Sequence, residues 1–441
     1  MKVNSIRKTR HIIRSDSFWN SLFKNSFWAF LGDSGAALIN LVISVLIIRG
    51  IGSDSYGVLL LGQSYMLVLD VLLNVQSWKG IIQYGQKCIA KKRNDDFMGY
   101  VKVGVIVDVV TAIAGGAIAI LVAGQIGKIF GWSNELILCA QISSYTIFSH
   151  ISGTATALLR IFNKFNLVAY QKLISSVVKL FALFFLFVVL HVNQLHEVMI
   201  IYVLSDIVGN MLLVLFAVRI YGKKYSIRKT IKSKIPKDTS KFLSFTIWGT
   251  VADAVDIPVN YLDGFIIASL GSSSVAVLKV FRQLVNVLQK AMSPIQQAIM
   301  PQFSELSANN MRKRGYDVVN KIHKYVLLFG MPLALVAGIT SPIWLSVVYG
   351  GLYAEYWYIF AIYAVVQTYA LSYAAIHPFF LSLDKPKQSA LYVAISNIVY
   401  LVIAYLLVSA IGIIGAVIAF AVQCVLVIWL KKIRIKKELG R

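Results

Sequence analysis

Residues 198–241 read VMIIYVLSDIVGNMLLVLFAVRIYGKKYSIRKTIKSKIPKDTSK, and they show the pattern from which the fold class can be predicted. Its first part, 198–218, is a mostly apolar run, and its second part, 219–241, holds nine basic residues. A bilayer-spanning helix needs roughly 20 mostly apolar residues. A helix also satisfies its own backbone N–H and C=O groups where lipid cannot. The stretch therefore predicts a membrane helix followed by a basic loop.

The same pattern extends along the chain in both directions. Hydrophobic residues make up 58% of the sequence and charged residues 14%, whereas soluble domains carry about a quarter charged residues. The apolar stretches are 26–48, 57–78, 103–123, 134–158, 173–190, 198–218, 242–268, 275–300, 325–348, 356–381, 388–409 and 412–430. We predict an all-α polytopic membrane protein with twelve transmembrane helices.

Basic residues occupy every second gap between these stretches. They cluster at 2–24, 87–102, 160–172, 219–241, 312–324, 385–387 and 431–441, which together hold 36 of the 43 Lys and Arg residues. A net charge of +24 would suggest nucleic acid in a soluble protein, but alternate placement instead marks cytoplasmic loops. We therefore predict two cytoplasmic termini and no nucleic-acid partner. The first 25 residues lack the apolar core of a cleavable signal peptide.

The basic stretch at the midpoint divides the spans into two sets of six. The predicted parts are a cytoplasmic segment 1–25, an N-lobe 26–220, a linker 221–241, a C-lobe 242–430 and a tail 431–441. Trp28, Asp33 and Asn40 match Trp248, Asp253 and Asn260 at a constant shift of 220, and Gly52 then falls near Gly271. This indicates a parallel repeat, which places a substrate path between the halves. We expect two pseudo-twofold-related six-helix lobes around a central cavity.

Ionisable residues concentrate in the seventh and eighth spans, where lipid makes them costly. Helical geometry puts each set near one side of its helix, and counting from Gly271 places Asp263 level with Lys279 and Asp253 level with Lys290. These residues are predicted to form a ladder between adjacent helices: Asp253, Asp256, Asp263, Lys279, Arg282 and Lys290.

Two interpretations of this ladder stay open. In one, the charges only neutralise each other and fix helix packing. In the other, they line a polar cavity in which Arg282, Lys290 and Lys279, with Asp263, bind an anionic substrate. Arg282 is the preferred phosphate ligand in this interpretation, because its planar fork binds oxygens bidentately.

Acids without an evident partner are candidates for ion coupling. Asp33 and Asp70 lie at similar depth in the first hairpin and have no evident cation at that depth. With Asp253 and Asp256, they are the residues that we expect to carry a proton or sodium ion. Lys179 is placed to pair with Asp108 or Asp206. His150 and His377 are interpreted as satisfied polar residues.

Several chemistries lack their sequence motifs. We find no phosphate-binding Gly-rich loop with its Lys and Ser/Thr, and no H-E-x-x-H. Cys88, Cys139 and Cys424 have no metal-ligand spacing. We therefore expect no enzyme activity, no metal and no cofactor, and a transport driven by protons, by sodium or by substrate exchange.

Four motifs carry a family resemblance. They are RGIGSDSYG at 49–57, LLRIFNKFN at 158–166, DGFII with Leu270-Gly271 at 263–271, and PQFSEL at 301–306. With these motifs the chain resembles the polysaccharide transporters, or Wzx-type O-antigen flippases, of the multidrug/oligosaccharidyl-lipid/polysaccharide exporter superfamily. It departs from the family pattern at Asn163 and Asn166, where acids are usual, and at Lys279, where relatives tend to have no cation.

The resemblance implies a flippase that works by alternating access in the bacterial inner membrane. Its substrate would be an undecaprenyl-diphosphate-linked oligosaccharide for O-antigen, lipopolysaccharide or another surface polysaccharide. A polysaccharide polymerase and a chain-length regulator are the implied partners. A lipid II flippase and a cation-coupled multidrug antiporter, which would need an anionic cavity, are the alternatives in the superfamily. A membrane glycosyltransferase would need a long outer loop, and none is present.

Overall fold

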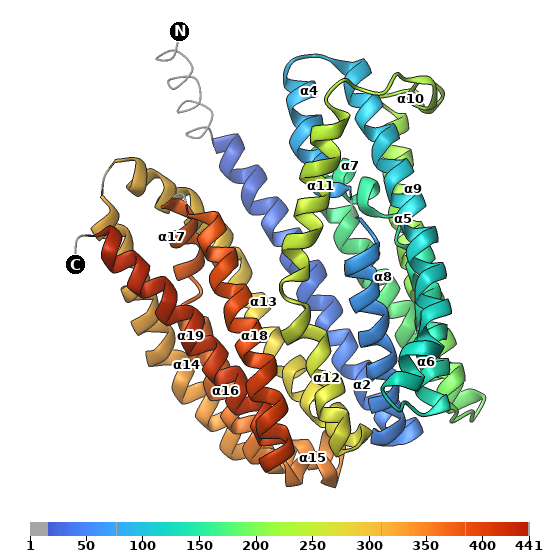
Figure 1. The fold of residues 1–441 in the computed structure, drawn as a ribbon, viewed down its shortest axis with the longest axis vertical. Coiled ribbons are helices and arrows are strands. Elements are labelled where there is room, and N and C mark those ends of the chain that lie inside the picture. Colours follow the sequence, from blue (N-terminus) through green and yellow to red (C-terminus); the bar gives the residue numbers. More distant parts are fainter. Residues whose placement is uncertain (1–15, 76, 310, 384, 440–441) are drawn as a thin grey trace.

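The computed structural model describes residues 16–75, 77–309, 311–383 and 385–439. The predicted basic residues at 2–14 and Arg441 lie outside these ranges. Every regular element in the described ranges is helical (Figure 1). Eight of these helices are long and apolar enough to span a membrane, or nine if the bent pair 239–270 counts as one span. The predicted count of twelve spans is reached only if the two halves of α2 each cross the membrane and if the broken segment 134–161 and α13 cross it as well.

The helices of the first half run from the start of the described chain to the linker. Their bounds are α2 Asp16–Leu73, α3 Trp78–Gly80, η1 Ile81–Gly85, α4 Gln86–Ala90, α5 Asn94–Ile129, α6 Asn134–Ser144, η2 Tyr145–Ser149, α7 Gly153–Ile161, α8 Phe165–Phe184, η3 Phe185–Val189, α9 Leu195–Gly222 and α10 Ile227–Lys232. The linker thus contains a short helix, α10, which its basic composition did not predict.

The helices of the second half follow the linker. Their bounds are α11 Thr239–Ala254, η4 Pro258–Leu262, α12 Asp263–Ile267, η5 Ala268–Leu270, α13 Ser272–Ala308, α14 Arg312–Tyr349, α15 Gly351–Glu355, α16 Trp357–Ser372, α17 Ile376–Ser382, α18 Pro386–Ile411 and α19 Ile413–Glu438.

Glycine makes the turn at corresponding places in the two halves. The two predicted spans within α2 are separated by Gly52, whose φ is 82°. Gly271 joins η5 to α13 with a φ of 107°. Such positive φ values are open to glycine at little cost. The two glycines are the pair that the predicted repeat aligns, and each begins the second helix of its hairpin.

The two groups of helices form a V (Figure 1). They diverge toward the end that carries α10 and α17, and they meet near α12 and α15. At the meeting end, one hydrophobic cluster combines α2 residues such as Ile43 and Ile47 with α13 residues such as Val277 and Phe281. Apolar packing therefore joins the halves at one end and leaves them apart at the other.

Polar contacts reinforce this closed end. The Ser273 N–H donates to the Asp54 carboxylate at 3.0 Å, and Arg49 donates to the Val347 carbonyl at 2.5 Å. Gly57 packs directly on the backbone of Ser272, where an added Cβ would lie 1.9 Å from the carbonyl oxygen. The first half and the second half thus touch backbone to backbone here.

The seventh span bends by 43° between α11 and η4. Phe242 of α11 packs in a cluster with Ile81, Phe97 and Tyr100 of the first half. Beyond the bend, η4 and α12 pack on α18. The segment therefore contacts both halves, although the sequence placed all of 242–430 in the C-lobe; that boundary stays a prediction.

Candidate functional site

A cavity of about 810 Å³ lies between the halves. Its wall is polar for a site inside a membrane protein, with amides supplied by both halves. The lining Asn and Gln residues are Asn40, Gln63, Asn260, Gln283, Asn286, Gln289, Gln367, Asn397 and Gln423. Four basic and two acidic side chains accompany them: Lys179, Lys279, Arg282, Lys290, Asp206 and Asp256.

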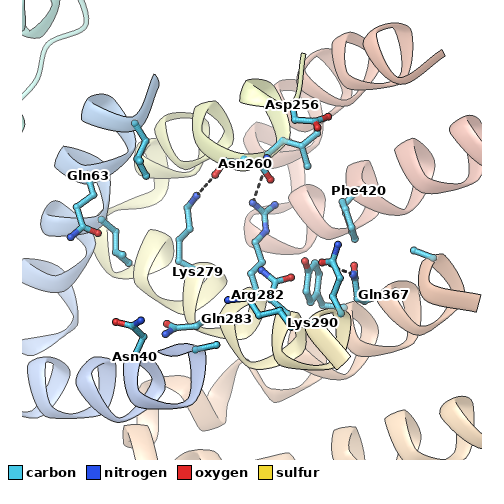
Figure 2. Close-up of a pocket in the computed structure, with 18 of the residues that line it drawn as sticks. Asn40, Gln63, Asp256, Asn260, Lys279, Arg282, Gln283, Lys290, Gln367 and Phe420 are labelled. Atoms are coloured by element: carbon cyan, nitrogen blue, oxygen red, sulfur yellow. Dashed lines mark hydrogen bonds between the residues drawn. The ribbon is translucent and has the colours of Figure 1, made fainter. Parts of the chain in front are cut away.

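Helix α13 contributes more of the polar wall than any other described helix, and Figure 2 shows four of its side chains. Lys279, Arg282, Gln283 and Lys290 point from this helix toward the cavity (Figure 2). Residues three or four apart share one helix face, so this polar stripe was visible in the sequence. The predicted ladder included only its charged members and missed the amides at 283, 286 and 289.

Arg282 is held by the protein itself. It pairs with Asp263, donates to the Val259 carbonyl at 3.2 Å and donates to the Tyr400 hydroxyl at 2.9 Å. Only 8% of Arg282 is exposed. The guanidinium fork that was expected to grip a phosphate is therefore already engaged, and Arg282 acts as a fixed positive charge in the wall.

Asp263 lies behind Arg282 and not in the cavity wall. Its carboxylate is fully buried and accepts a hydrogen bond from the Tyr400 hydroxyl at 2.9 Å. Lys279 Nζ lies 3.6 Å from the same carboxylate. The predicted contact of Asp263 with Lys279 and Arg282 is thus present. It places Asp263 as the counter-ion that positions the two bases.

The π-helical turn η4, in the seventh span, provides backbone acceptors for the same two bases. Pro258 has no N–H to donate, and 258–262 form a π-helical turn. The Val259 carbonyl accepts from Arg282, and the Asn260 carbonyl accepts from Lys279 at 2.9 Å (Figure 2). Because lipid cannot satisfy such carbonyls, the two bases stabilise the irregular turn as well as charging the wall.

The second rung of the predicted ladder is wrong. Asp253 pairs with Lys79 of α3 at 2.6 Å, not with Lys290. The 43° bend explains the difference, because it carries α11 away from α13 and onto the first half. Lys290 instead donates to the backbone carbonyl of Asp33 at 3.2 Å. Asp256 does line the cavity, where Asn397 donates to it at 3.2 Å.

The expectation that Asp33 and Asp70 lack partners is also wrong. Asp33 pairs with Lys172 of α8. Asp70 lies 2.9 Å from His150 Nδ1 and accepts from Asn74 at 3.0 Å. Neither Lys172 nor His150 is close in sequence to its acid, so depth counting within one hairpin could not find them. Neither acid is among the residues lining the central cavity.

Of the two acids expected to pair with Lys179, Asp108 and Asp206, the structure places Asp206 beside it. Lys179 pairs with Asp206 at 2.9 Å. Asp108 instead accepts hydrogen bonds from the Ser77 and Thr154 backbone N–H groups at 3.0 and 2.6 Å. In the described residues no group of three or more His, Cys, Asp or Glu could hold a metal ion.

A family model and a curated inner membrane protein match this chain in sequence. The family described as polysaccharide biosynthesis protein matches residues 22–307. The Escherichia coli K12 inner membrane protein YghQ is 27% identical over 161 residues, which is 36% of this chain and 44% of that protein. The alignment thus spans less than half of that relative.

Two solved structures share the fold at low sequence identity. An inward-facing multidrug resistance MATE family transporter of the MOP superfamily aligns with a TM-score of 0.74 and 13% identity, covering 91% of this chain and 95% of that one. The lipid II flippase MurJ, in an inward closed conformation, aligns with a TM-score of 0.67 and 14% identity, covering 96% and 88%. The predicted all-α polytopic fold is confirmed; the twelve-helix, two-lobe arrangement stays a prediction.

Proposed function

We propose that this chain, which belongs to the polysaccharide biosynthesis protein family, is a flippase for an undecaprenyl-diphosphate-linked oligosaccharide. The observation that carries the proposal is the cavity between the halves, where bases outnumber acids and amides fill most of the remaining polar wall. A membrane transporter of the MOP fold with such a cavity suits an anionic, hydroxyl-rich cargo. The bacterial inner membrane is the proposed location, as the name of the relative YghQ states for that protein.

Each part of the cargo has a matching chemistry. The diphosphate binds to Lys279 and Lys290, whose ammonium groups each carry three donors, beside the fixed charge of Arg282. Sugar hydroxyls meet the amides, which both donate and accept. The polyprenyl tail stays in lipid. Without such a path, moving a diphosphate through hydrocarbon is prohibitive because it loses its hydration.

The cavity also bears on the alternatives. A multidrug antiporter for cationic compounds would need excess acid in the wall, and four bases face two acids here. Lipid II shares the polyprenyl diphosphate, so it differs from the proposed cargo in the group that the diphosphate carries. O-antigen or another surface polysaccharide remains our preferred pathway, with a polymerase and a chain-length regulator as proposed partners.

Transport by purified protein in vesicles tests the proposal. A fluorescent undecaprenyl-diphosphate oligosaccharide, lipid II and a cationic dye are compared, and arrival at the far leaflet is read with a membrane-impermeant quencher. We expect Lys290→Gln to lower the rate of oligosaccharide flipping about tenfold or more, because a hydrogen bond to a charge contributes roughly 1.5–3 kcal/mol.

The matched control is Lys313→Gln, an exposed base on α14 outside the cavity wall. It should flip cargo at the wild-type rate. If wild type transported the dye and flipped neither lipid, and if Asp256→Asn abolished dye transport, the protein would instead be an antiporter. Faster flipping of lipid II than of the oligosaccharide would assign the cell-wall pathway.

A further inference from the structure

A second hollow, of about 430 Å³, lies on the first half of the molecule. It is lined by α5, α7, α9 and α10, and it shares no lining residue with the central cavity. Val105 and Ile106 of α5, Val218 of α9, and Ile227 and Ile231 of α10 expose between 45% and 65% of their surface here. The hollow is therefore open, apolar and separate from the proposed transport path.

The few polar groups of this hollow already have partners. The Tyr221 and Thr230 hydroxyls hydrogen bond at 2.6 Å. The Thr154 hydroxyl donates to Asp108 at 2.6 Å, and Lys102 donates to the Ser233 carbonyl at 3.1 Å. Because each of these wall groups has a partner in the protein and the rest of the wall is apolar, a hydrocarbon chain is the chemistry that fits inside the hollow.

Helix α10 separates this apolar hollow from a basic one. Ile227 and Ile231 line the apolar side, whereas Arg228, Lys229 and Lys232 line a neighbouring hollow of about 840 Å³. Lys234 and Lys237 add two more bases there, opposite Asp95 and Asp96. In the described part of the chain, these five bases make no ion pair within 4 Å. The short helix α10 is therefore amphipathic, with apolar side chains toward one hollow and bases toward the other.

The linker is fixed against α5 and is not a loose connection. An added Cβ at Gly99 would lie 2.6 Å from the Lys234 carbonyl oxygen and 2.8 Å from Pro236. The Ser226 hydroxyl caps α10 by accepting from the Lys229 N–H at 3.4 Å, and Lys102 holds the carbonyl of Ser233. The apolar hollow and its basic rim are thus held in place together.

We propose that this surface is a binding site for an anionic phospholipid of the surrounding bilayer. One acyl chain fills the hollow lined by α5, α7, α9 and α10. The headgroup phosphate lies on the bases of α10, which attract anionic lipid at the membrane surface. The occupant is not the transported lipid, because the proposed cargo path uses other residues and opens between the halves.

Native mass spectrometry of the full-length protein in mild detergent tests the site. Phosphatidylglycerol and phosphatidylcholine with identical acyl chains are added at equal concentration. We expect wild type to retain phosphatidylglycerol preferentially, and Arg228→Gln/Lys229→Gln/Lys232→Gln to lower that preference by at least about fivefold. Val105→Trp, at an exposed position on the wall, should reduce retention of both lipids by blocking the hollow.

The matched control removes the same charge from the second half. Lys313→Gln/Arg314→Gln/Lys321→Gln changes three exposed bases and should leave the preference unchanged. Equal retention of the two lipids by wild type, an equal loss in the control, or undiminished retention in Val105→Trp would each overturn the proposal. Displacement of phosphatidylglycerol by undecaprenyl phosphate would assign the hollow to the cargo tail and overturn it too. Thermal melting of each variant confirms that it is folded.

Discussion

At the scale of single residues, the charges of the cavity are arranged in two ways. Arg282 is almost enclosed by Asp263, Tyr400 and a backbone carbonyl, whereas Lys290 donates only to the backbone of Asp33 among the described residues. A buried charge that loses its partner lowers the stability of the protein strongly, whereas a partly exposed charge with a backbone acceptor has little effect on stability. The first arrangement therefore governs stability, and the second is free to serve a ligand.

Removing the Asp263 carboxylate should therefore destabilise the protein. In Asp263→Asn, the buried Arg282 loses its counter-ion, and we expect the free energy of unfolding to fall by about 3–5 kcal/mol. Removing both charges, in Asp263→Asn/Arg282→Gln, should recover part of that loss, because of the two bases beside Asp263 only Lys279 then lacks its counter-ion. Lys290→Gln should unfold as wild type does. Equilibrium unfolding in detergent measures all three, and a double variant no more stable than the single one contradicts the coupling.

Residue types and depth along each helix could be predicted from the sequence, but partners between distant helices could not. Asp263, Lys279 and Arg282 were found because Gly271 fixes the register of one hairpin. Asp253 was given the wrong partner, and Asp33 and Asp70 were left without one. Their partners, Lys79, Lys172 and His150, lie on segments whose packing no local pattern specifies. The amides of α13 have a readable helical spacing, but a ladder predicted from charged residues alone leaves them out.

At the scale of elements, the bent seventh span, 239–270, and the glycines of the two hairpins determine where the cavity lies. The bend before Pro258 lets α11 pack on the first half while α12 packs on the second. Pro258 in the sequence permits a kink. The sequence does not specify the angle of that kink or the side to which α11 turns. The repeat aligned Gly52 with Gly271, and the structure shows why glycine occupies both places, because each turn has a positive φ.

Gly57 should be intolerant of a side chain. A Cβ at Gly57 would lie 1.9 Å from the Ser272 carbonyl, so Gly57→Val must push α2 away from α13 at the closed end. We expect a loss of about 1–3 kcal/mol of stability, as for other overpacked contacts. A cysteine at buried Ser274 should then react faster with a water-soluble maleimide.

Gly124→Val is the matched control, since nothing lies within 4 Å of a Cβ added at Gly124. This variant should melt near wild type and leave the Ser274→Cys reaction slow. Unchanged labelling in Gly57→Val would show that the added side chain does not separate α2 from α13, and would contradict the prediction.

At the scale of the whole molecule, the shape fits one of the two states that the proposed flippase would need for alternating access. The halves are apart at the end carrying α10 and α17 and joined at the other (Figure 1). Shared hydrophobic packing and the Asp54–Ser273 hydrogen bond hold the joined end. For cargo to leave there, these contacts must break while the open end closes, which is a change between two packed arrangements.

Joining the two halves at the closed end should therefore stop transport. In Asp54→Cys/Ser273→Cys, a short bifunctional thiol reagent with a cleavable disulfide links α2 to α13 near an existing contact of 3.0 Å. Flipping in vesicles should cease on cross-linking and return after reduction. Lys385→Cys/Glu438→Cys is the matched control, because its side chains, 3.4 Å apart, both belong to the second half. Full cross-linking of the first pair without loss of flipping would show that cargo crosses while this end stays joined.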